Sequence, residues 1–289
     1  MSSDLPSNYN AKIQKEVVKV RHLIIVCISL IVISLIFTGV SNAKIDPASV
    51  IGAWLFDEGN GAVAKDSSAN HFDGKVVGAK WQKGKNGSCL EFSGVAGENY
   101  VDCGDQDKLN YVGDGKFSVT LWVKVLANDA NYHNLVSKKM GFNNTDKGWM
   151  VWYDFRFQGA MELRINDGTT LNDDVPVAPD NTLMAKSQDG NWHHLGWVIT
   201  EPGKFIYYFD GENKGEGIFA MKGSTKNSVS LRMGNSEGNS PGLNCLMDEV
   251  GIFNVTLTDA DIQELMKNGI VLAVFPLSKL ASTWGEVKK

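Results

Sequence analysis

The segment that decides the fold is Met247-Asp248-Glu249-Val250-Gly251-Ile252-Phe253, near the end of the chain. Side chains alternate between the two faces of a strand, so Asp248, Val250 and Ile252 are expected on one face. A carboxylate in line with apolar neighbours is expected to be buried, and burial requires hydrogen bonds, an ion pair or a metal. The strand therefore needs a partner for Asp248.

The candidate partner lies far upstream, in the polar loop Asp66-Ser67-Ser68-Ala69-Asn70-His71-Phe72-Asp73-Gly74. This loop offers carboxylate, hydroxyl and amide oxygens, which are the ligands that calcium prefers. If the loop meets Asp248, the first and last thirds of the domain close on one cation site. The alternative is a solvated loop whose backbone N–H groups donate to Asp248.

Alternating and apolar segments predict a domain built from strands. The clearest is FSVTLWVKV, residues 117–125, whose apolar residues at 117, 119, 121 and 123 share one face. Further strands are predicted at 50–56, 88–92, 100–103, 134–138, 149–155, 161–166, 192–200, 204–209, 229–233 and 246–253. One helix is predicted over 259–267, with Thr258 as its N-cap. Many short strands and one short C-terminal helix predict an all-β, two-sheet antiparallel sandwich.

Charge and cysteine content narrow the class of protein. The 289 residues carry a formal net charge of −5, whereas a nucleic-acid surface needs clustered Lys and Arg, so no nucleic-acid partner is expected. Cys89, Cys103 and Cys245 are an odd number within the domain, which excludes a complete disulfide framework. Cys89 and Cys103 also follow opposite parities in a predicted hairpin, so buried free thiols are expected.

The first 43 residues have the pattern of an export segment. A basic region precedes an apolar run without charges from Leu23 to Val40, and the small residues of Ser41-Asn42-Ala43 follow. We expect residues 1–43 to be a signal peptide cleaved after Ala43, with a retained membrane anchor as the alternative. Either outcome places the domain outside the cytoplasm: secreted, periplasmic or at the cell surface.

The predicted domain spans residues 44–268, and a tail of residues 269–289 is expected to pack on or beside it. Within this tail, the apolar residues 271–275 are expected either to add an edge strand or to pack under the sandwich.

Six motifs occur in a recognisable order. They are WLFDEGNG (54–61), DSSAN (66–70), LEFSG (90–94), FSVTLWV (117–123), WHH (192–194) and MDEVGIF (247–253). In this order they resemble the laminin-G-like, concanavalin-A-like jelly-roll modules of bacterial surface and secreted proteins. The resemblance covers about residues 50–268 and implies two packed antiparallel sheets.

The resemblance also implies a calcium ion, which in this family often lies between the early Asp-Ser-Ser loop and the acid of the last strand. Carried over, the ligands are Asp66, Asn70, Asp248 and a backbone carbonyl near Gly74. One departure is Ala69, where the family usually has glycine. If that position requires a positive φ, alanine is strained there and the loop differs.

A dense aromatic group, Trp149, Trp152, Tyr153 and Phe155, is a candidate glycan platform, because aromatic faces stack on sugars. Parity places Trp152 on the face opposite to the other three, which makes it the best exposed candidate. Tyr132 and His133 are further candidates for ligand binding. The alternative is that these aromatic residues belong to the core.

Hydrolysis is not expected, although some concanavalin-A-like proteins are glycoside hydrolases. Such enzymes need two carboxylates close together, and the nearest candidate strand, ELRIN at 162–166, has Arg164 and Asn166 where acids are required. The G-x-S-x-G at 234–238 is followed by loop residues, whereas a nucleophile elbow is followed by a helix.

We therefore expect an extracytoplasmic, non-catalytic binding module, stabilised by calcium, that recognises a glycan or a surface protein. A polysaccharide-acting hydrolase of the same fold and a purely structural surface domain are the alternatives.

Overall fold

The computed structural model describes residues 45–274, except 114, 128–130, 144, 156–159, 170–173, 177–185, 220–222 and 239, together with residues 17, 19 and 21. The chain divides into two units, Met1–Asn42 and Ala43–Lys289, and all elements below belong to the second. The predicted export run at 23–40, its cleavage site and residues 275–289 lie outside the described residues. Within the described part, no helix combines the length and hydropathy needed to cross a membrane.

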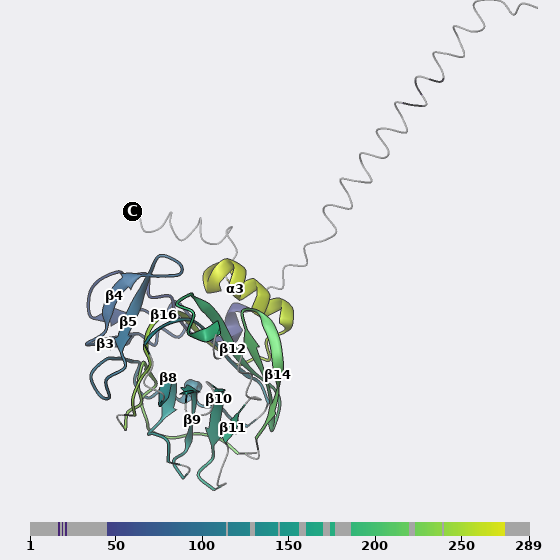
Figure 1. The fold of residues 1–289 in the computed structure, drawn as a ribbon. Helices are drawn as coiled ribbons and strands as arrows, with labels where there is room; N and C mark the ends of the chain where they lie inside the picture. The colour runs from purple at the N-terminus through teal and green to yellow at the C-terminus, as the bar shows by residue number, and fades with distance from the viewer. Residues whose placement is uncertain are drawn as a thin grey trace, which may run out of the picture. The chain divides into compact units, whose positions relative to one another are not determined.

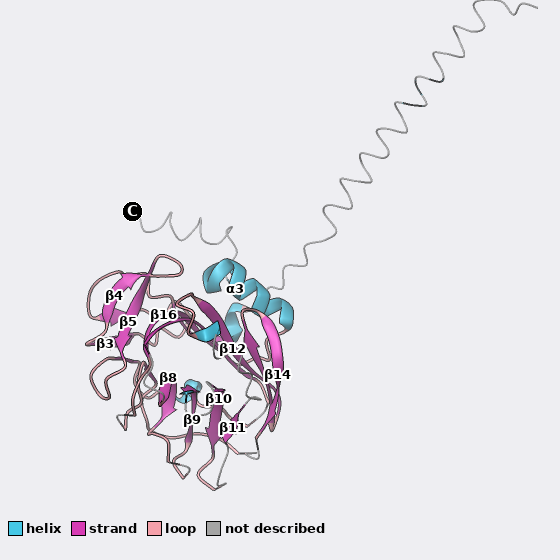
Figure 2. Cartoon of the chain, viewed as in Figure 1, coloured by secondary structure: helices cyan, strands magenta, loops and turns pink. Residues whose placement is uncertain are grey.

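Two eight-stranded antiparallel sheets form the domain (Figures 1 and 2). Sheet A has the order β14 (Glu212–Ile218), β13 (Lys204–Phe209), β12 (His193–Glu201), β7 (Phe117–Ala127), β16 (Asn244–Phe253), β5 (Ser88–Ser93) and β4 (Lys80–Lys83), and β1 (Val50–Trp54) also pairs with β16. Sheet B has the order β11 (Asp174–Pro176), β10 (Ala160–Asn166), β9 (Gly148–Asp154), β8 (Tyr132–Lys139), β15 (Arg232–Met233), β6 (Tyr100–Asp102), β3 (Gly74–Val77) and β2 (Val63–Ala64). The predicted all-β sandwich is confirmed.

The main core lies between the sheets and is built from alternate residues of their strands. The predicted apolar row of β7 is confirmed, because Phe117, Val119, Leu121 and Val123 all belong to this core. They share it with alternate residues of β9 and β10 from sheet B: Trp149, Val151, Tyr153, Met161, Leu163 and Ile165. Cys89, Cys103 and Cys245 are buried free thiols, as predicted.

The outer face of sheet A, turned away from sheet B, is covered by the helix α3 (Asp259–Val274) and by the 3-10 helix η1 (Pro47–Ser49). A second apolar cluster joins Val198, Tyr208 and Phe253 of the sheet to Ile262 and Leu265 of the helix. Figure 1 shows α3 lying beside β12 and β14. The helix therefore adds a third layer to the sandwich on this side.

The helix is longer than predicted, because the chain resumes helical structure after an interruption at Gly269 (φ 74°). Ile270 is buried in the second cluster, and the packing of the whole tail, residues 269–289, stays a prediction. Residues 271–274 are helical, so the alternative of an edge strand is wrong for them.

The strands that sequence reasoning missed are short or lie at sheet edges: β2, β3, β4, β11 and β14. The sequences of β4 (KWQK) and β14 (ENKGEGI) are polar, and most of their side chains are not buried. Alternation between apolar and polar residues is absent where neither face is buried, so the pattern could not reveal them.

Candidate functional site

Asp66 organises the loop between β1 and β3. Its Oδ1 accepts hydrogen bonds from the backbone N–H groups of Ala53 and Ser68, both at 2.8 Å. Its Oδ2 accepts from the Ser68 hydroxyl and from the N–H of Phe72, also at 2.8 Å. The side chain is 2% exposed, so the carboxylate is fully used in holding the loop.

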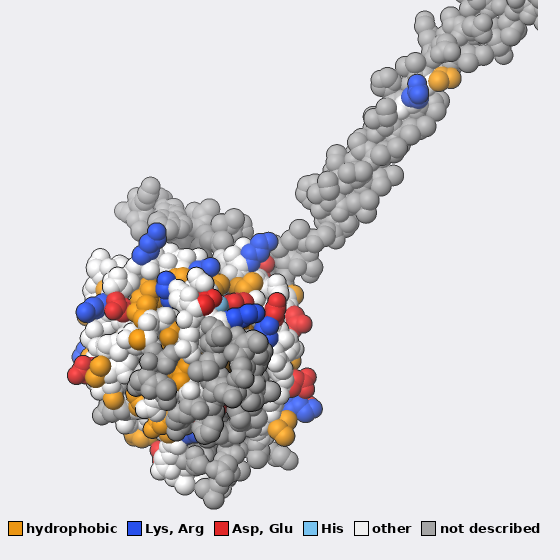
Figure 3. Space-filling view, viewed as in Figure 1, with side chains coloured by type: hydrophobic (Ala, Val, Ile, Leu, Met, Phe, Trp, Pro, Cys, Tyr) orange, Lys and Arg blue, Asp and Glu red, His pale blue; other side chains and the backbone are white. Residues whose placement is uncertain are grey.

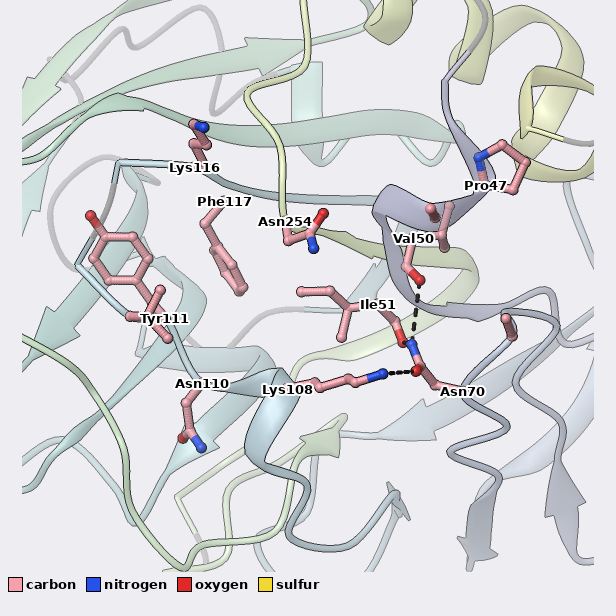
Figure 4. A pocket seen from close by; sticks show the side chains of 13 residues that line it. Pro47, Val50, Ile51, Asn70, Lys108, Asn110, Tyr111, Lys116, Phe117 and Asn254 are labelled. Carbon is pink, nitrogen blue, oxygen red and sulfur yellow. Dashed lines mark hydrogen bonds between the residues drawn. The ribbon is translucent and has the colours of Figure 1, made fainter.

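Asn70 fastens the same loop to β1. Its Nδ2 donates to the carbonyl oxygens of Ile51 (2.8 Å) and Val50 (3.5 Å), which orients its Oδ1 to accept from the ammonium of Lys108 at 2.6 Å. Figure 4 shows this chain of contacts.

Two glycine-related expectations concern the same loop. The residue with a positive φ is His71 (φ 52°) and not Ala69, so the strain considered for alanine is absent. Gly74 begins β3, where it pairs with Ala64 of β2, and a Cβ there would lie 2.3 Å from Val101. A close approach between strands therefore accounts for this glycine.

The last strand, β16, contains a bulge at Glu249, which has a φ of 46°. Asp248 is opposite Trp122 of β7, but Gly251 is opposite Thr120, so one extra residue is inserted between them. Val250 faces the core, and the bulge moves Asp248 out of its row. The prediction that these two side chains share one face is therefore wrong.

Asp248 lies under the turn that joins β4 to β5. Its Oδ2 accepts from the N–H groups of Lys85 (2.9 Å) and Asn86 (3.1 Å), whereas its Oδ1 has no hydrogen-bond partner among the described residues. The side chain is fully buried, and burial raises the pKa of this carboxyl to about 7. This value includes a smaller increase from the charges of Glu249 and Asp57 and a decrease from the two N–H donors.

These contacts do not fit the calcium site that the resemblance implies. Asp66 and Asp248 accept hydrogen bonds from different segments, and the Oδ1 of Asn70 already accepts an ammonium group. The described part of the chain contains no group of three or more His, Cys, Asp or Glu side chains that could hold a metal ion. Calcium binding by Asp66, Asn70, Gly74 and Asp248 stays a prediction that none of these contacts supports.

The aromatic candidates lie on β8 and β9. Trp152 is outside the core row, as parity predicted, but it is only 2% exposed, so its expected exposure is wrong. The ring of Phe142 packs against it at 4.6 Å, that of Tyr132 at 5.9 Å, and the guanidinium of Arg164 lies 4.9 Å from its centre. The outer face of sheet B is therefore closed over Trp152 by its own side chains.

His133 has a different position. It is 5% exposed, its Nδ1 lies 2.8 Å from the carbonyl oxygen of Gly242, and it lines a cavity of about 320 Å³ beside Asn244 and Val95.

Glu162 and Asp154 lie on neighbouring strands of sheet B, with their side chains on its outer face. These two acids were not considered as a pair from the sequence. Glu162 of β10 is opposite Trp152 of β9, and Asp154 is two residues further along β9. Only acids along a single strand were considered from the sequence, so this pair was missed. The two side chains are 4% and 1% exposed, which leaves neither open to a substrate. Ser236 of the G-x-S-x-G is 0% exposed and the residues after it are not helical.

A second cavity, of about 430 Å³, opens beside η1, the 3-10 helix η2 (Asp107–Leu109) and the start of β7 (Figure 4). Its apolar lining comes from Pro47, Ala48 and Val112, which are not buried, and from Ile51, Tyr111 and Phe117, which belong to the main core and are at most 6% exposed. Lining residues with polar heads are Asn70, Lys108, Lys116 and Asn254; Asn110 also lines the cavity, but its Nδ2 donates back to the carbonyl of Asp107 (3.2 Å). We call this cavity the η1–η2 pocket.

The η1–η2 pocket could not be recognised from sequence spacing, because its walls come from segments near residues 47–51, 69–70, 108–117 and 254. Asn70 is the one predicted site residue that lines it. No Asp or Glu is among the lining residues, although acids outnumber bases in the chain, 33 to 28.

The two stacked antiparallel sheets define a jelly-roll sandwich, a class that contains both binding modules and hydrolases. The chain belongs to the concanavalin A-like lectin/glucanases superfamily, whose laminin G family model matches residues 95–263. No curated protein matches the sequence.

Two of the solved structures with this fold are described as binding domains. The binding domain of Paraclostridial Mosquitocidal Protein 1 is 14% identical, with a TM-score of 0.61 over 76% of this chain and 52% of that one. The botulinum neurotoxin serotype D ligand binding domain in complex with N-acetylneuraminic acid is 17% identical, with a TM-score of 0.55 over 78% and 52%. This chain thus spans about half of each of these two domains.

Domain 4 of AbnA, a GH43 extracellular arabinanase from Geobacillus stearothermophilus in complex with arabinotriose, is also 17% identical. Its TM-score is 0.53, over 76% of this chain and 98% of that one. At these identities the likeness shows the fold alone.

Proposed function

We propose that this protein is a non-catalytic binding module that takes a glycan into the η1–η2 pocket. The proposal rests on one observation: apolar side chains and the polar groups of Asn70, Lys108 and Asn254 line the same cavity (Figure 4). A sugar ring presents C–H faces and hydroxyl edges, which match apolar side chains and amide or ammonium groups respectively. The volume of about 430 Å³ falls within the usual range of ligand pockets, about 300–1,000 Å³.

The solved relatives support a carbohydrate ligand. Two of the domains with this fold are described in complex with a sugar, arabinotriose in one and N-acetylneuraminic acid in the other. An extracellular protein is the other partner class that we predict, and it becomes the favoured one if no glycan binds.

The absence of catalysis is supported by the burial of Asp154 and Glu162, because a glycosidase must present both carboxylates to its substrate. An extracytoplasmic location is supported by the apolar run from Leu23 to Val40 and the small residues after it. N-terminal sequencing of the exported protein is expected to begin at Lys44, and recovery of Met1 in a membrane fraction would show an anchor instead.

A glycan array, followed by calorimetry on each hit, tests the proposal. Ala69 is exposed and lines the η1–η2 pocket, so Ala69→Trp fills the pocket without disturbing the core. Ala62 is exposed in the same part of the chain and does not line it, so Ala62→Trp is the matched control. We expect Ala69→Trp to abolish binding and Ala62→Trp to preserve it. Equal binding by both variants would place the glycan elsewhere.

A further inference from the structure

We infer that the η1–η2 pocket selects acidic glycans, sugar chains that carry carboxylate or sulfate groups. This inference rests on the proposed function and adds the charge of the ligand. The inference rests on Lys108. Its ammonium group is held at the pocket by a hydrogen bond, and no carboxylate among the described residues forms an ion pair with it.

Lys108 is held by a neutral partner. Its Nζ donates to the Oδ1 of Asn70 at 2.6 Å, and Asn70 is itself held by the carbonyl oxygens of Val50 and Ile51. These carbonyls can accept only from the amide nitrogen, so the amide oxygen must face the lysine. Only one of the three N–H donors of the ammonium is used by Asn70, and the group is held in place before any ligand arrives.

The acids next to the lining residues are engaged elsewhere. Asp107 precedes Lys108 but forms an ion pair with Lys226 at 3.0 Å. Asp46 precedes η1 and accepts the backbone N–H of Ala48 at 2.9 Å as the N-cap of that helix. Among the described residues, no ion pair involves Lys108. An anion is the ligand group that would complete its contacts.

The rest of the pocket suits a sugar that carries such an anion. Lys116 lines the same cavity, and no lining residue is acidic. Basic residues gathered at a concave site in an acidic protein attract anions over the rest of the surface. The apolar residues Pro47, Ala48 and Val112 also line the cavity without being buried, and they offer apolar surface to a sugar ring. A small inorganic anion would leave this surface uncovered.

Two matched pairs of ligands test the inference by calorimetry on the full chain. The first pair is the trimer of galacturonic acid and its methyl ester, which differ only in charge. The second is dextran sulfate and dextran, which separates sulfate from carboxylate as the recognised group. Inorganic sulfate alone separates a glycan from a free anion.

Lys108→Gln removes the ammonium group and keeps a polar side chain of similar reach. Lys65→Gln removes an exposed lysine that does not line the pocket and forms none of the ion pairs of the described residues, so it is the matched control. Both lysine side chains are exposed, so both variants are expected to fold, and their melting temperatures verify this.

We expect at least one acidic ligand to bind roughly tenfold or more tightly than its neutral partner, the range of a charge-assisted hydrogen bond. Lys108→Gln is expected to remove this preference, and Lys65→Gln is expected to preserve it. The preference should also shrink as sodium chloride is added, because rim charges are screened.

Equal binding of charged and neutral partners, or a preference that survives Lys108→Gln, would overturn the inference while leaving the glycan-binding proposal standing. Tight binding of inorganic sulfate without any glycan would overturn it too, because the site would then recognise a free anion. If no glycan binds, or if Ala69→Trp has no effect on binding, the proposed function itself fails and the inference fails with it.

Discussion

The carboxylate of Asp248 is expected to make the folded protein less stable as the pH rises from about 4 to about 7. One of its oxygens accepts two backbone N–H groups, and the other is buried without a partner in the described chain. Burial, which disfavours the charged form, raises its pKa to about 7.

The sign follows from proton binding. Between the unfolded pKa, about 3.9, and the folded pKa, about 7, the folded state holds a proton that the unfolded state releases. The free energy of unfolding therefore falls through this window as pH rises. About three pH units at about 1.4 kcal/mol each set an upper limit of about 4 kcal/mol for the loss.

Asp248→Asn removes the charge, keeps the shape and still offers an oxygen to the two N–H groups. We expect the variant to be more stable than wild type at pH 8, by a few kcal/mol, which is on the order of 10 °C in melting temperature for a domain of this size. At pH 4 the two proteins should unfold alike. Urea unfolding from pH 4 to pH 8 in the presence of a chelator measures the difference.

Glu98→Gln controls for the loss of one negative charge, because Glu98 is exposed in the loop between β5 and β6. Two results would refute the reasoning. Parallel stability curves for wild type and Asp248→Asn would mean that the carboxyl does not titrate near pH 7. A variant less stable at every pH would mean that the charged form is stabilised where it lies.

Three further predictions concern histidine, calcium and catalysis. Burial disfavours the charge on His193, but hydrogen bonds to Asp210 and Asp189 outweigh this effect and raise its pKa. The contribution of His193 to stability is therefore present below pH 6.5 and is lost as the pH rises through the folded pKa. Asp210→Asn should lower the pKa of His193 measured by NMR, and an unchanged pKa would contradict these contacts. Since the oxygens of Asp66 are saturated, we expect equal melting temperatures in calcium and in chelator; a rise of several degrees with calcium would show a site that these contacts do not reveal. The protein is expected not to hydrolyse β-glucans, and turnover that disappears on Glu162→Gln would show otherwise.

The sandwich could be predicted from local patterns, because most of its strands bury one face. The alternation in residues 117–125 identified β7 and its core-facing row. Edge strands such as β14 were not predicted, because most of their side chains are not buried and their sequences do not alternate between apolar and polar residues.

Partners of buried polar groups were harder to predict. The need of Asp248 for hydrogen bonds followed from its apolar neighbours, and the structure meets that need with backbone N–H groups. The donors belong to the β4–β5 turn, however, and not to the loop at 66–74, because the bulge at Glu249 turns the side chain to the other face of β16. One inserted residue reverses a period-two prediction, and no local pattern signals it.

The sequence by itself determined the fold class, the core-facing rows of the long strands, the free thiols and the need for a polar partner at Asp248. Only the tertiary structure decided that Trp152 is covered, that Asn70 holds Lys108, and that residues near 50, 70, 110 and 254 enclose one pocket. The physical reason is the separation along the chain between the residues that each feature depends on. Strand patterns record the environment of neighbouring residues, whereas a pocket depends on contacts between segments far apart in the chain, which form only when the two sheets and their covering layer are assembled.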